Sequence, residues 1–292
     1  MDEPKILLIG AHGQVGWQLR RTLAPLGRVL AVGRRELDLT DLEMIRRLVQ
    51  QDRPALIVNA AAYTAVDKAE SETALAQRIN AEAPGVLAES AKQVDAWLLH
   101  YSTDYVFDGT KAEPYLEADI PNPVGAYGRT KLAGEQRIQE VDGKHLIFRL
   151  CWVYGERGNN FMLTIQRLAQ ERTELKVVND QIGCPTWSRQ IAEASTLALQ
   201  QVLSGSSSAS KRGIYHIASV GFTSWHGFAT KIIEWMPEKE RRCQELKPIS
   251  TKEYPTAARR PAYSVLECNK LKEIFKIQLP HWEDQLKLVL ER

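Results

Sequence analysis

The chain has 292 residues, of which 44% are hydrophobic and 25% are charged, and its formal net charge is +2. These values are typical of a soluble globular protein with a sizeable core, and they exclude a strongly basic nucleic-acid-binding protein. The start, MDEPKILLIG, is acidic and has a short apolar run, unlike a signal peptide, and no apolar run approaches the ~20 residues that span a bilayer. The four cysteines are far apart and are typical of reduced thiols. We therefore expect a cytoplasmic protein with neither a membrane nor a nucleic-acid partner.

Apolar runs of strand length alternate with helical patterns through the first half of the chain. The predicted strands are KILLIG (5–10), RVLAVG (28–33), ALIVNAAA (55–62), WLLHYSTDYVF (97–107) and HLIFRLCWVYG (145–155). Continuously apolar strands that are separated by helices indicate a parallel sheet with both faces covered. The predicted fold class is therefore α/β, a Rossmann-type doubly wound parallel sheet.

The pattern becomes less regular after about residue 155, where shorter elements are separated by prolines. We expect a smaller, partly discontinuous C-terminal substrate lobe here. Residues 1–150 plus roughly 176–218 are assigned to a dinucleotide-binding domain, and roughly 151–175 plus 219–292 to the substrate-binding lobe. The low-complexity stretch SGSSSASKRG (204–213) is expected to be an exposed loop.

A glycine-rich turn follows the first predicted strand and opens the first helix. Glycine at positions 10, 13 and 16 permits positive φ and lets the backbone approach a pyrophosphate, which the helix N-terminus then faces. A glycine triplet is weak evidence alone, but its place at the start of a βαβ series indicates a dinucleotide. We therefore predict cofactor contacts from Gly10, Gly13 and Gly16.

The second predicted strand ends in Arg34 and Arg35, where a site for the NAD ribose usually carries Asp or Glu. Arginine suits a 2′-phosphate, so NADPH is favoured and NADH is the alternative. Two solvated arginines would give the same pattern. Asp38 is placed either to meet the adenine or to begin a helix cap. The small residues in NAAA (59–62) leave room for a flat ligand beside the third strand.

A cluster of hydroxyl groups and one ammonium group indicates the chemistry. The segment STDY (102–105) ends the fourth strand, at the edge where open α/β sheets bind ligands. Tyr127 and Lys131 follow, one helical turn apart. A nearby cation lowers the pKa of a phenol from ~10, so we expect Tyr127 to act as a general acid or base, with Thr103 bonded to the same substrate oxygen. The alternative is a packing contact between two amphipathic side chains.

These motifs, in this order, resemble the extended short-chain dehydrogenase/reductases that act on nucleotide sugars. The chain most resembles the dTDP-4-dehydrorhamnose reductase family, on the segments GAHGQVGWQL, VNAAAYTAVDKAE, HYSTDYVFDG, YGRTKLAGE, NNF, NDQIGCPT and YPTAARRP, which span residues 10 to about 261. The resemblance implies reduction of the C4 ketone of dTDP-4-dehydro-L-rhamnose to dTDP-L-rhamnose. Hydride would come from NAD(P)H, and Tyr127 would be the proton donor.

The residues and the resemblance together give a full set of expected site positions. The catalytic residues are Thr103, Tyr127 and Lys131. The cofactor contacts are Gly10, Gly13, Gln14, Val15, Gly16, Arg34, Asp38, Leu39, Ala61, Ala62, Tyr63, Thr64, Tyr127 and Lys131. The contacts with the nucleotide-sugar substrate are Thr103, Asp104, Tyr105, Trp152 and Arg259. Arg260 is the alternative for the diphosphate, which suits arginine's planar donor fork, and packing is the alternative role for Trp152.

Two departures from the family pattern argue against dehydratase activity and against a Mg²⁺ site between subunits. Sugar 4,6-dehydratases carry Glu where this chain has Tyr105, so one carboxylate that elimination needs is missing. Some relatives bind Mg²⁺ between subunits through acidic residues, and the matching positions here are Gln18, Arg189 and Gln190, which are poor ligands for a hard cation. We therefore expect no metal, and a monomer or weak homodimer. A related nucleotide-sugar epimerase or reductase stays open, as does a non-catalytic dinucleotide-binding regulatory subunit resembling that of methionine adenosyltransferase.

Overall fold

The computed structural model describes residues 3–204 and 208–291. Part of the loop expected at 204–213 lies outside the described residues, and Ser208–Lys211 forms a 3-10 turn. None of the helices within the described ranges combines the length and apolarity needed to cross a bilayer.

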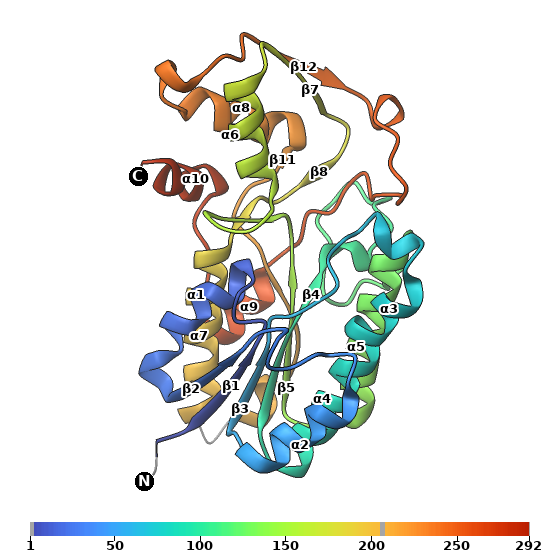
Figure 1. Cartoon of the computed structure of the whole chain (residues 1–292), viewed down its shortest axis with the longest axis vertical. Helices are drawn as coiled ribbons and strands as arrows, with labels where there is room; N and C mark the ends of the chain where they lie inside the picture. The colour runs from blue at the N-terminus through green and yellow to red at the C-terminus, as the bar shows by residue number, and fades with distance from the viewer. Residues whose placement is uncertain (1–2, 205–207, 292) are drawn as a thin grey trace.

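A six-stranded sheet forms the centre of the larger part of the molecule (Figure 1). Its strands are β1 (Lys5–Ile9), β2 (Arg28–Val32), β3 (Leu56–Asn59), β4 (Trp97–Thr103), β5 (His145–Leu150) and β10 (Gly213–Ile217). They lie in the order β10-β5-β4-β3-β1-β2, and every neighbouring pair is parallel. The predicted doubly wound sheet is therefore confirmed. The winding direction reverses between β1 and β3, and ligands bind such folds at the carboxyl ends of the strands at this point.

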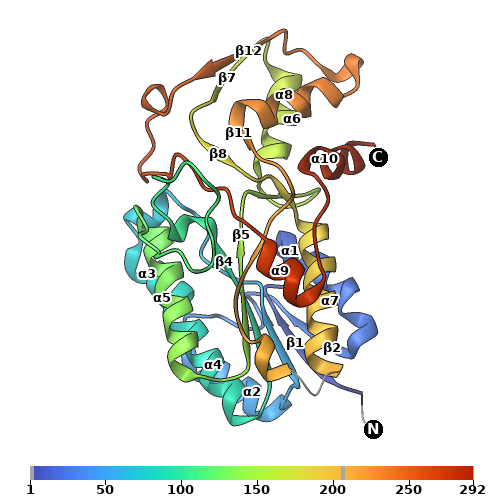
Figure 2. The same cartoon turned by 180° about the vertical axis from the view of Figure 1, so that it is seen from behind.

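Helices cover both faces of the sheet (Figures 1 and 2). One layer contains α1 (Gln14–Thr22), α7 (Ser188–Ser204) and α9 (Asn269–Phe275). The other contains α2 (Leu42–Asp52), α3 (Thr73–Gln77), a π-helical turn (Arg78–Glu82), α4 (Ala83–Gln93) and α5 (Ala126–Val141). The β4 strand is buried along its whole length because it lies between the two layers. Leu99 packs in the cluster on the α1 side, and Leu98 packs in the cluster on the α2 side.

A smaller lobe lies beyond one end of the sheet (Figure 1). Its elements are β6 (Val153–Tyr154), α6 (Phe161–Glu171), β7 (Glu174–Val178), β8 (Ile182–Gly183), β9 (Thr186–Trp187), β11 (Thr223–Ser224), α8 (Trp225–Trp235), β12 (Glu245–Ile249) and α10 (Trp282–Leu290). The strands form three two-stranded sheets, β7 with β12, β8 with β11 and β6 with β9. A separate aromatic-rich core that includes Tyr154, Phe228 and Trp282 holds much of the lobe together.

The packing suggests where the two parts divide. Val177 in β7 packs in the core of the smaller lobe, together with Phe228. Phe275 at the end of α9 packs in the core on the α1 side of the main sheet. We therefore propose a division in which 174–187 join the smaller lobe and 269–279 join the larger part.

Candidate functional site

The loop after β1 is shaped for close approach of the backbone. Gly10 has φ of 81°, and a Cβ at this position would lie 2.6 Å from the backbone nitrogen of Ala61. A Cβ at Gly16 would clash with the carbonyl oxygen of Gly10, so glycine lets α1 pack against the loop. Gly13 differs, because a Cβ there would meet nothing closer than 3.4 Å, and no side chain caps the start of α1. An open glycine and an uncapped helix start fit the pyrophosphate of a dinucleotide.

Gln14 and Val15 begin α1, and both are half-buried. The Gln14 side chain is engaged within the protein, because Asn160 Nδ2 donates a hydrogen bond to its Oε1 at 3.0 Å. The Arg157 guanidinium lies 3.7 Å from the centre of the Trp17 ring on the same helix. These contacts join the glycine loop to the segment that leads into the smaller lobe. Because the Gln14 side chain is engaged in this way, we expect Gln14 to contact a cofactor through its backbone.

The end of β2 carries charges of both signs. Arg34 is exposed. Asp38 accepts hydrogen bonds from the backbone N–H and hydroxyl of Thr40, both at 2.9 Å. These bonds, and to a smaller extent the charge of Arg34, lower the pKa of Asp38. The Glu36 carboxylate accepts the Gly33 N–H at 2.8 Å. The amino-acid sequence alone did not single out Glu36.

The loop after β3 is held by Asn80 from the π-helical turn. The Tyr63 N–H donates to Asn80 Oδ1 at 2.8 Å, and Asn80 Nδ2 donates to the Tyr63 carbonyl at 3.1 Å. The remaining predicted cofactor contacts in this region are Ala61 and Ala62, both half-buried, Thr64, which is exposed, and Leu39, which is buried. Asn80 therefore orders the backbone where cofactor contacts are expected.

The structure brings four predicted residues together where β4 ends. Thr103 Oγ1 donates to Asp104 Oδ1 at 3.0 Å, and Thr103 is near enough to the Tyr127 phenol to lower its pKa in part. The rings of Tyr105 and Tyr127 meet edge to face, with centroids 5.8 Å apart. The Cys151 thiol donates to Asp104 Oδ2 at 3.2 Å. Burial raises the pKa of Asp104 to about 6. A hydroxyl, a phenol and an acid that titrates near neutral pH therefore share one site.

In the arrangement that the structure shows, Lys131 does not lower the pKa of Tyr127, which differs from the expectation from the sequence. Lys131 Nζ donates to the carbonyl of Tyr101 at 2.6 Å and lies 3.1 Å from His100 Nε2. No hydrogen bond within the described ranges joins it to Tyr127. Burial raises the pKa of Tyr127 to about 12, and contact with Thr103 offsets only part of this effect. Tyr127 is therefore held as a neutral phenol, the form that can donate a proton.

Glu70 anchors the helix that carries Tyr127. Its Oε1 accepts the N–H of Ala126, the first residue of α5, at 2.7 Å, and its Oε2 lies 3.7 Å from the Arg129 guanidinium. The N-cap residue, Gly125, has no side chain to do this. The amino-acid sequence did not reveal this contact, because Glu70 and Ala126 are 56 positions apart.

Trp152 lies on the side of the smaller lobe and interrupts the strand predicted at 145–155. The β5 strand ends at Leu150, and Trp152 then adopts φ of 40°. Such a value is a genuine outlier for a bulky residue and is common at functional sites. The ring of Trp152 stacks on Trp225, with centroids 3.5 Å apart and planes at 6°. It also covers Gly183, where any Cβ would clash with it. Packing thus holds the ring of Trp152 in one orientation.

Comparison with known proteins places this geometry in a family. The family model described as "RmlD substrate binding domain" matches residues 4–292. A dTDP-4-dehydrorhamnose reductase of Burkholderia thailandensis is 50% identical over 283 residues, which are 95% of this chain and 95% of the relative. The chain belongs to the dTDP-4-dehydrorhamnose reductase family. The family member of Escherichia coli strain K12 is 44% identical over 291 residues, which cover 98% of this chain and 96% of that one.

Solved structures agree with this assignment. The dTDP-4-dehydrorhamnose reductase of Bacillus anthracis, crystallised in complex with NADP, has a TM-score of 0.91 and 37% sequence identity, and the match covers 100% of this chain and 99% of that one. A UDP-glucose 4-epimerase of Thermus thermophilus in complex with NAD has a TM-score of 0.80 at 20% identity, which shows a shared fold alone. The family resemblance and the fold class predicted from the sequence are both confirmed.

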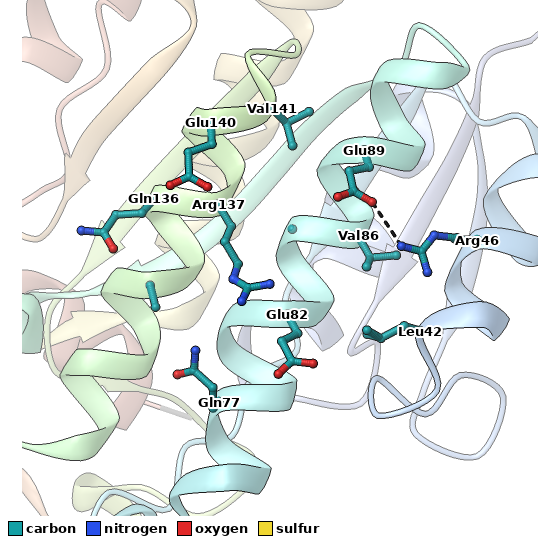
Figure 3. Close-up of a pocket in the computed structure, with 12 residues that line it drawn as sticks. Leu42, Arg46, Gln77, Glu82, Val86, Glu89, Gln136, Arg137, Glu140 and Val141 are labelled. Carbon is teal, nitrogen blue, oxygen red and sulfur yellow. Dashed lines mark hydrogen bonds and ion pairs between the residues drawn. The ribbon is translucent and has the colours of Figure 1, made fainter.

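A groove of about 660 Å³ lies away from the candidate site, on the outer side of α2, α4 and α5 (Figure 3). Many of its lining residues are charged, and an ion pair of 3.2 Å joins Arg46 of α2 to Glu89 of α4. Arg137 and Glu140 of α5 lie on the opposite wall. None of the site residues predicted for this family lines the groove, so it is separate from the candidate active site.

Proposed function

We propose that this chain catalyses the reduction of the C4 ketone of dTDP-4-dehydro-L-rhamnose to dTDP-L-rhamnose, with NADPH as the hydride donor and NADH as the alternative. Membership of the dTDP-4-dehydrorhamnose reductase family supports the reaction, and the NADP complex of the Bacillus anthracis relative supports the cofactor. The observation that carries the proposal is the place of Tyr127, a neutral and half-buried phenol whose ring meets that of Tyr105 directly after Thr103, at the carboxyl end of β4.

In this proposal the glycine loop holds the cofactor. Gly10 and Gly13 would let the pyrophosphate approach the first turn of α1, and Arg34 would meet a 2′-phosphate. The loop ordered by Asn80 would lie against the nicotinamide half. When bound, NADPH supplies the hydride that reduces the ketone carbon.

Tyr127 is the proposed acid. Its phenolic proton would pass to the oxygen at C4 as that oxygen gains negative charge, while the Thr103 hydroxyl bonds to the same oxygen. Lys131 would leave His100 and approach Tyr127, where its charge stabilises the phenolate that remains. Asp104, Tyr105 and Trp152 would contact the sugar, and Arg259 would bind the diphosphate.

The proposal also covers the state of the protein in the cell. We infer a cytoplasmic monomer or weak homodimer. Arg189 forms an ion pair with Glu193 at 3.0 Å, and Gln190 donates a hydrogen bond to the same carboxylate. These two positions match acidic Mg²⁺ ligands of some relatives, but here they carry a cation and an amide, which are poor ligands for Mg²⁺. Light scattering across a range of protein concentrations, with and without Mg²⁺, tests this inference. A tight dimer that dissociates when Mg²⁺ is removed would contradict it.

The reaction is tested by following NADPH oxidation with dTDP-4-dehydro-L-rhamnose and identifying the product by NMR. One NADPH consumed for each dTDP-L-rhamnose formed supports the reductase. Binding of NADPH without turnover of any 4-keto sugar would instead support a regulatory subunit. A change of sugar stereochemistry without net consumption of NADPH would support an epimerase. The same assay with NADH measures the cofactor preference.

A further inference from the structure

A row of buried polar side chains runs from the end of β3 to α5. The register of the sheet sets Asn59 of β3 directly beside His100 of β4. Asn59 Nδ2 lies 3.1 Å from His100 Nδ1, and His100 Nε2 lies 3.1 Å from Lys131 Nζ. All three side chains are at most 1% exposed. Their hydrogen bonds must therefore be satisfied almost entirely by one another and by the backbone.

One backbone amide determines the donors and acceptors along this row. The Ala61 N–H donates to Asn59 Oδ1 at 3.2 Å, which identifies the oxygen end of the amide. Asn59 Nδ2 is then the donor toward His100, and His100 Nδ1 must accept. A neutral imidazole has a single N–H, so its proton lies on Nε2 and is directed at Lys131. Lys131 can accept this hydrogen bond only as a neutral amine, because an ammonium group has no lone pair.

The charges around the row are consistent with this assignment. Burial, and next the charge of Lys131, lower the pKa of His100 well below its ordinary value, so the imidazole is neutral. Burial lowers the pKa of Lys131 to about 8, and Glu135 opposes the shift. The ammonium form therefore dominates at neutral pH, and the amine form dominates above about pH 8. Glu135 itself forms a buried ion pair with Arg149 of β5 at 2.6 Å. The other titratable groups at this end of β4 and α5 are Tyr101, Asp104, Tyr105 and Tyr127.

We propose that Asn59 and His100 are a positioning pair that controls where Lys131 can carry its charge. Beside His100, Lys131 rests as the amine and donates to the Tyr101 carbonyl. As the ammonium ion it is released from His100 and can approach Tyr127. This inference rests on the proposed function, in which Lys131 supports proton donation by Tyr127. It assigns a role to two buried polar residues to which the family resemblance gave none.

The tautomer of His100 is measured directly in the ligand-free protein by ¹⁵N NMR of labelled histidine. The chain has six histidines, and the signals lost in His100→Gln identify this one. We record the spectra above about pH 8, where Lys131 is the amine, and expect a neutral ring with its proton on Nε2. In Asn59→Asp, one carboxylate oxygen still accepts the Ala61 N–H, and the other accepts from Nδ1, so the proton is expected to move to Nδ1. A wild-type proton on Nδ1, or an imidazolium, would overturn the inference.

The consequence for Lys131 is measured from the pH dependence of NADPH affinity and of kcat/KM. In both Asn59→Asp and His100→Gln an acceptor can face the ammonium group of Lys131. The apparent pKa of the basic limb, where affinity and kcat/KM fall at high pH, is therefore expected to rise by about one unit in each variant. Tyr101→Phe is the matched control. Tyr101 lies on the same strand as His100, and the substitution removes its buried hydrogen bond of 2.8 Å to Ser195 of α7. It keeps the backbone carbonyl that Lys131 uses, so the basic limb of its profile should not move.

The outcomes separate this inference from the proposed function. Folded Asn59→Asp and His100→Gln proteins with unshifted basic limbs would overturn the inference even if the wild type turns over the keto sugar. An equal shift in Tyr101→Phe would do the same, since it would reveal a general effect of disturbing β4. If no keto sugar is turned over, the proposed function fails, while the tautomer and the pH dependence of NADPH affinity still decide the role of Asn59 and His100.

Discussion

Asp67 and Arg260 form an ion pair of 3.0 Å that joins the loop after β3 to the C-terminal part of the chain. The second carboxylate oxygen of Asp67 accepts the N–H of Ala258, also at 3.0 Å. One side chain thus holds the backbone on both sides of Arg259. Arg259 is exposed, and within the described part of the chain it has no hydrogen-bond or ion-pair partner for its guanidinium. The two adjacent arginines therefore differ: Arg260 holds the segment, and Arg259 is available to an anion.

Arg259→Ala is expected to raise KM for the nucleotide sugar by about tenfold or more, because a charge-assisted hydrogen bond contributes roughly 1.5–3 kcal/mol. Its kcat and thermal stability should change little. Arg260→Ala is the comparison, and it should lower the melting temperature because it leaves Asp67 without its partner. Initial rates at varied substrate concentration and thermal unfolding measure the two effects. A larger rise in KM for Arg260→Ala than for Arg259→Ala would reverse the assignment.

Asp104 predicts a specific dependence of stability on pH. Burial raises the pKa of its carboxyl group from 3.8 to about 6. The native state then binds more protons than the unfolded chain between these values, so the free energy of unfolding falls as pH rises from about 4 to about 6. The full effect is about 3 kcal/mol, and Asp104→Asn should remove it. Urea unfolding at several pH values measures the slope, and equal slopes in the two proteins would show that Asp104 is not its source.

Glu70 predicts a link between helix capping and catalysis. Glu70→Ala leaves the Ala126 N–H without its acceptor and should lower the free energy of unfolding by about 1 kcal/mol. Because the same turn carries Tyr127, kcat should fall while NADPH affinity changes little. Glu70→Gln keeps an oxygen acceptor and is expected to restore most of both losses. Full activity in Glu70→Ala would show that the position of Tyr127 does not depend on this contact.

Glu36 predicts a change in cofactor preference. Its carboxylate lies at the Gly33 N–H, at the end of β2, where Rossmann folds bind the adenine ribose. Glu36→Gln removes a negative charge that opposes a 2′-phosphate but keeps an acceptor, so the ratio of kcat/KM for NADPH to that for NADH should rise several-fold. Arg34→Ala should change the ratio in the opposite direction. Ratios that do not move in either variant would place cofactor selection elsewhere.

Features that depend on short stretches of chain could be predicted from the sequence. The alternation of apolar strands with helical patterns determines the doubly wound sheet. Glycine is needed after β1 because a Cβ at Gly10 or Gly16 would clash with backbone atoms. The hydroxyl-bearing residues at the end of β4 are close to Tyr127, as the order of strand and helix implies. Each of these predictions needs only the position of a residue within its own element.

Features that depend on partners distant in sequence could not be predicted. The direction of the Lys131 side chain is determined by His100 and the Tyr101 carbonyl, 31 and 30 positions away. Spacing alone placed Lys131 beside Tyr127, and only the three-dimensional structure reveals the competing acceptors. A histidine within the apolar run WLLHYST was the available signal. The break at Trp152 depends likewise on its stacking against Trp225, in a different part of the chain.

The central claim is that Tyr127 donates the proton when a 4-keto sugar is reduced, and one kinetic comparison tests it most directly. The measurement is kcat for NADPH oxidation with dTDP-4-dehydro-L-rhamnose, for the wild type, Tyr127→Phe and Tyr105→Phe, with NADPH affinity determined for each protein. Tyr105→Phe removes the neighbouring phenol and preserves the edge-to-face packing. We predict that Tyr127→Phe lowers kcat by about 10²–10⁴-fold with NADPH affinity within a few-fold of wild type, while Tyr105→Phe acts mainly on KM. A Tyr127→Phe protein that keeps wild-type kcat would contradict the claim.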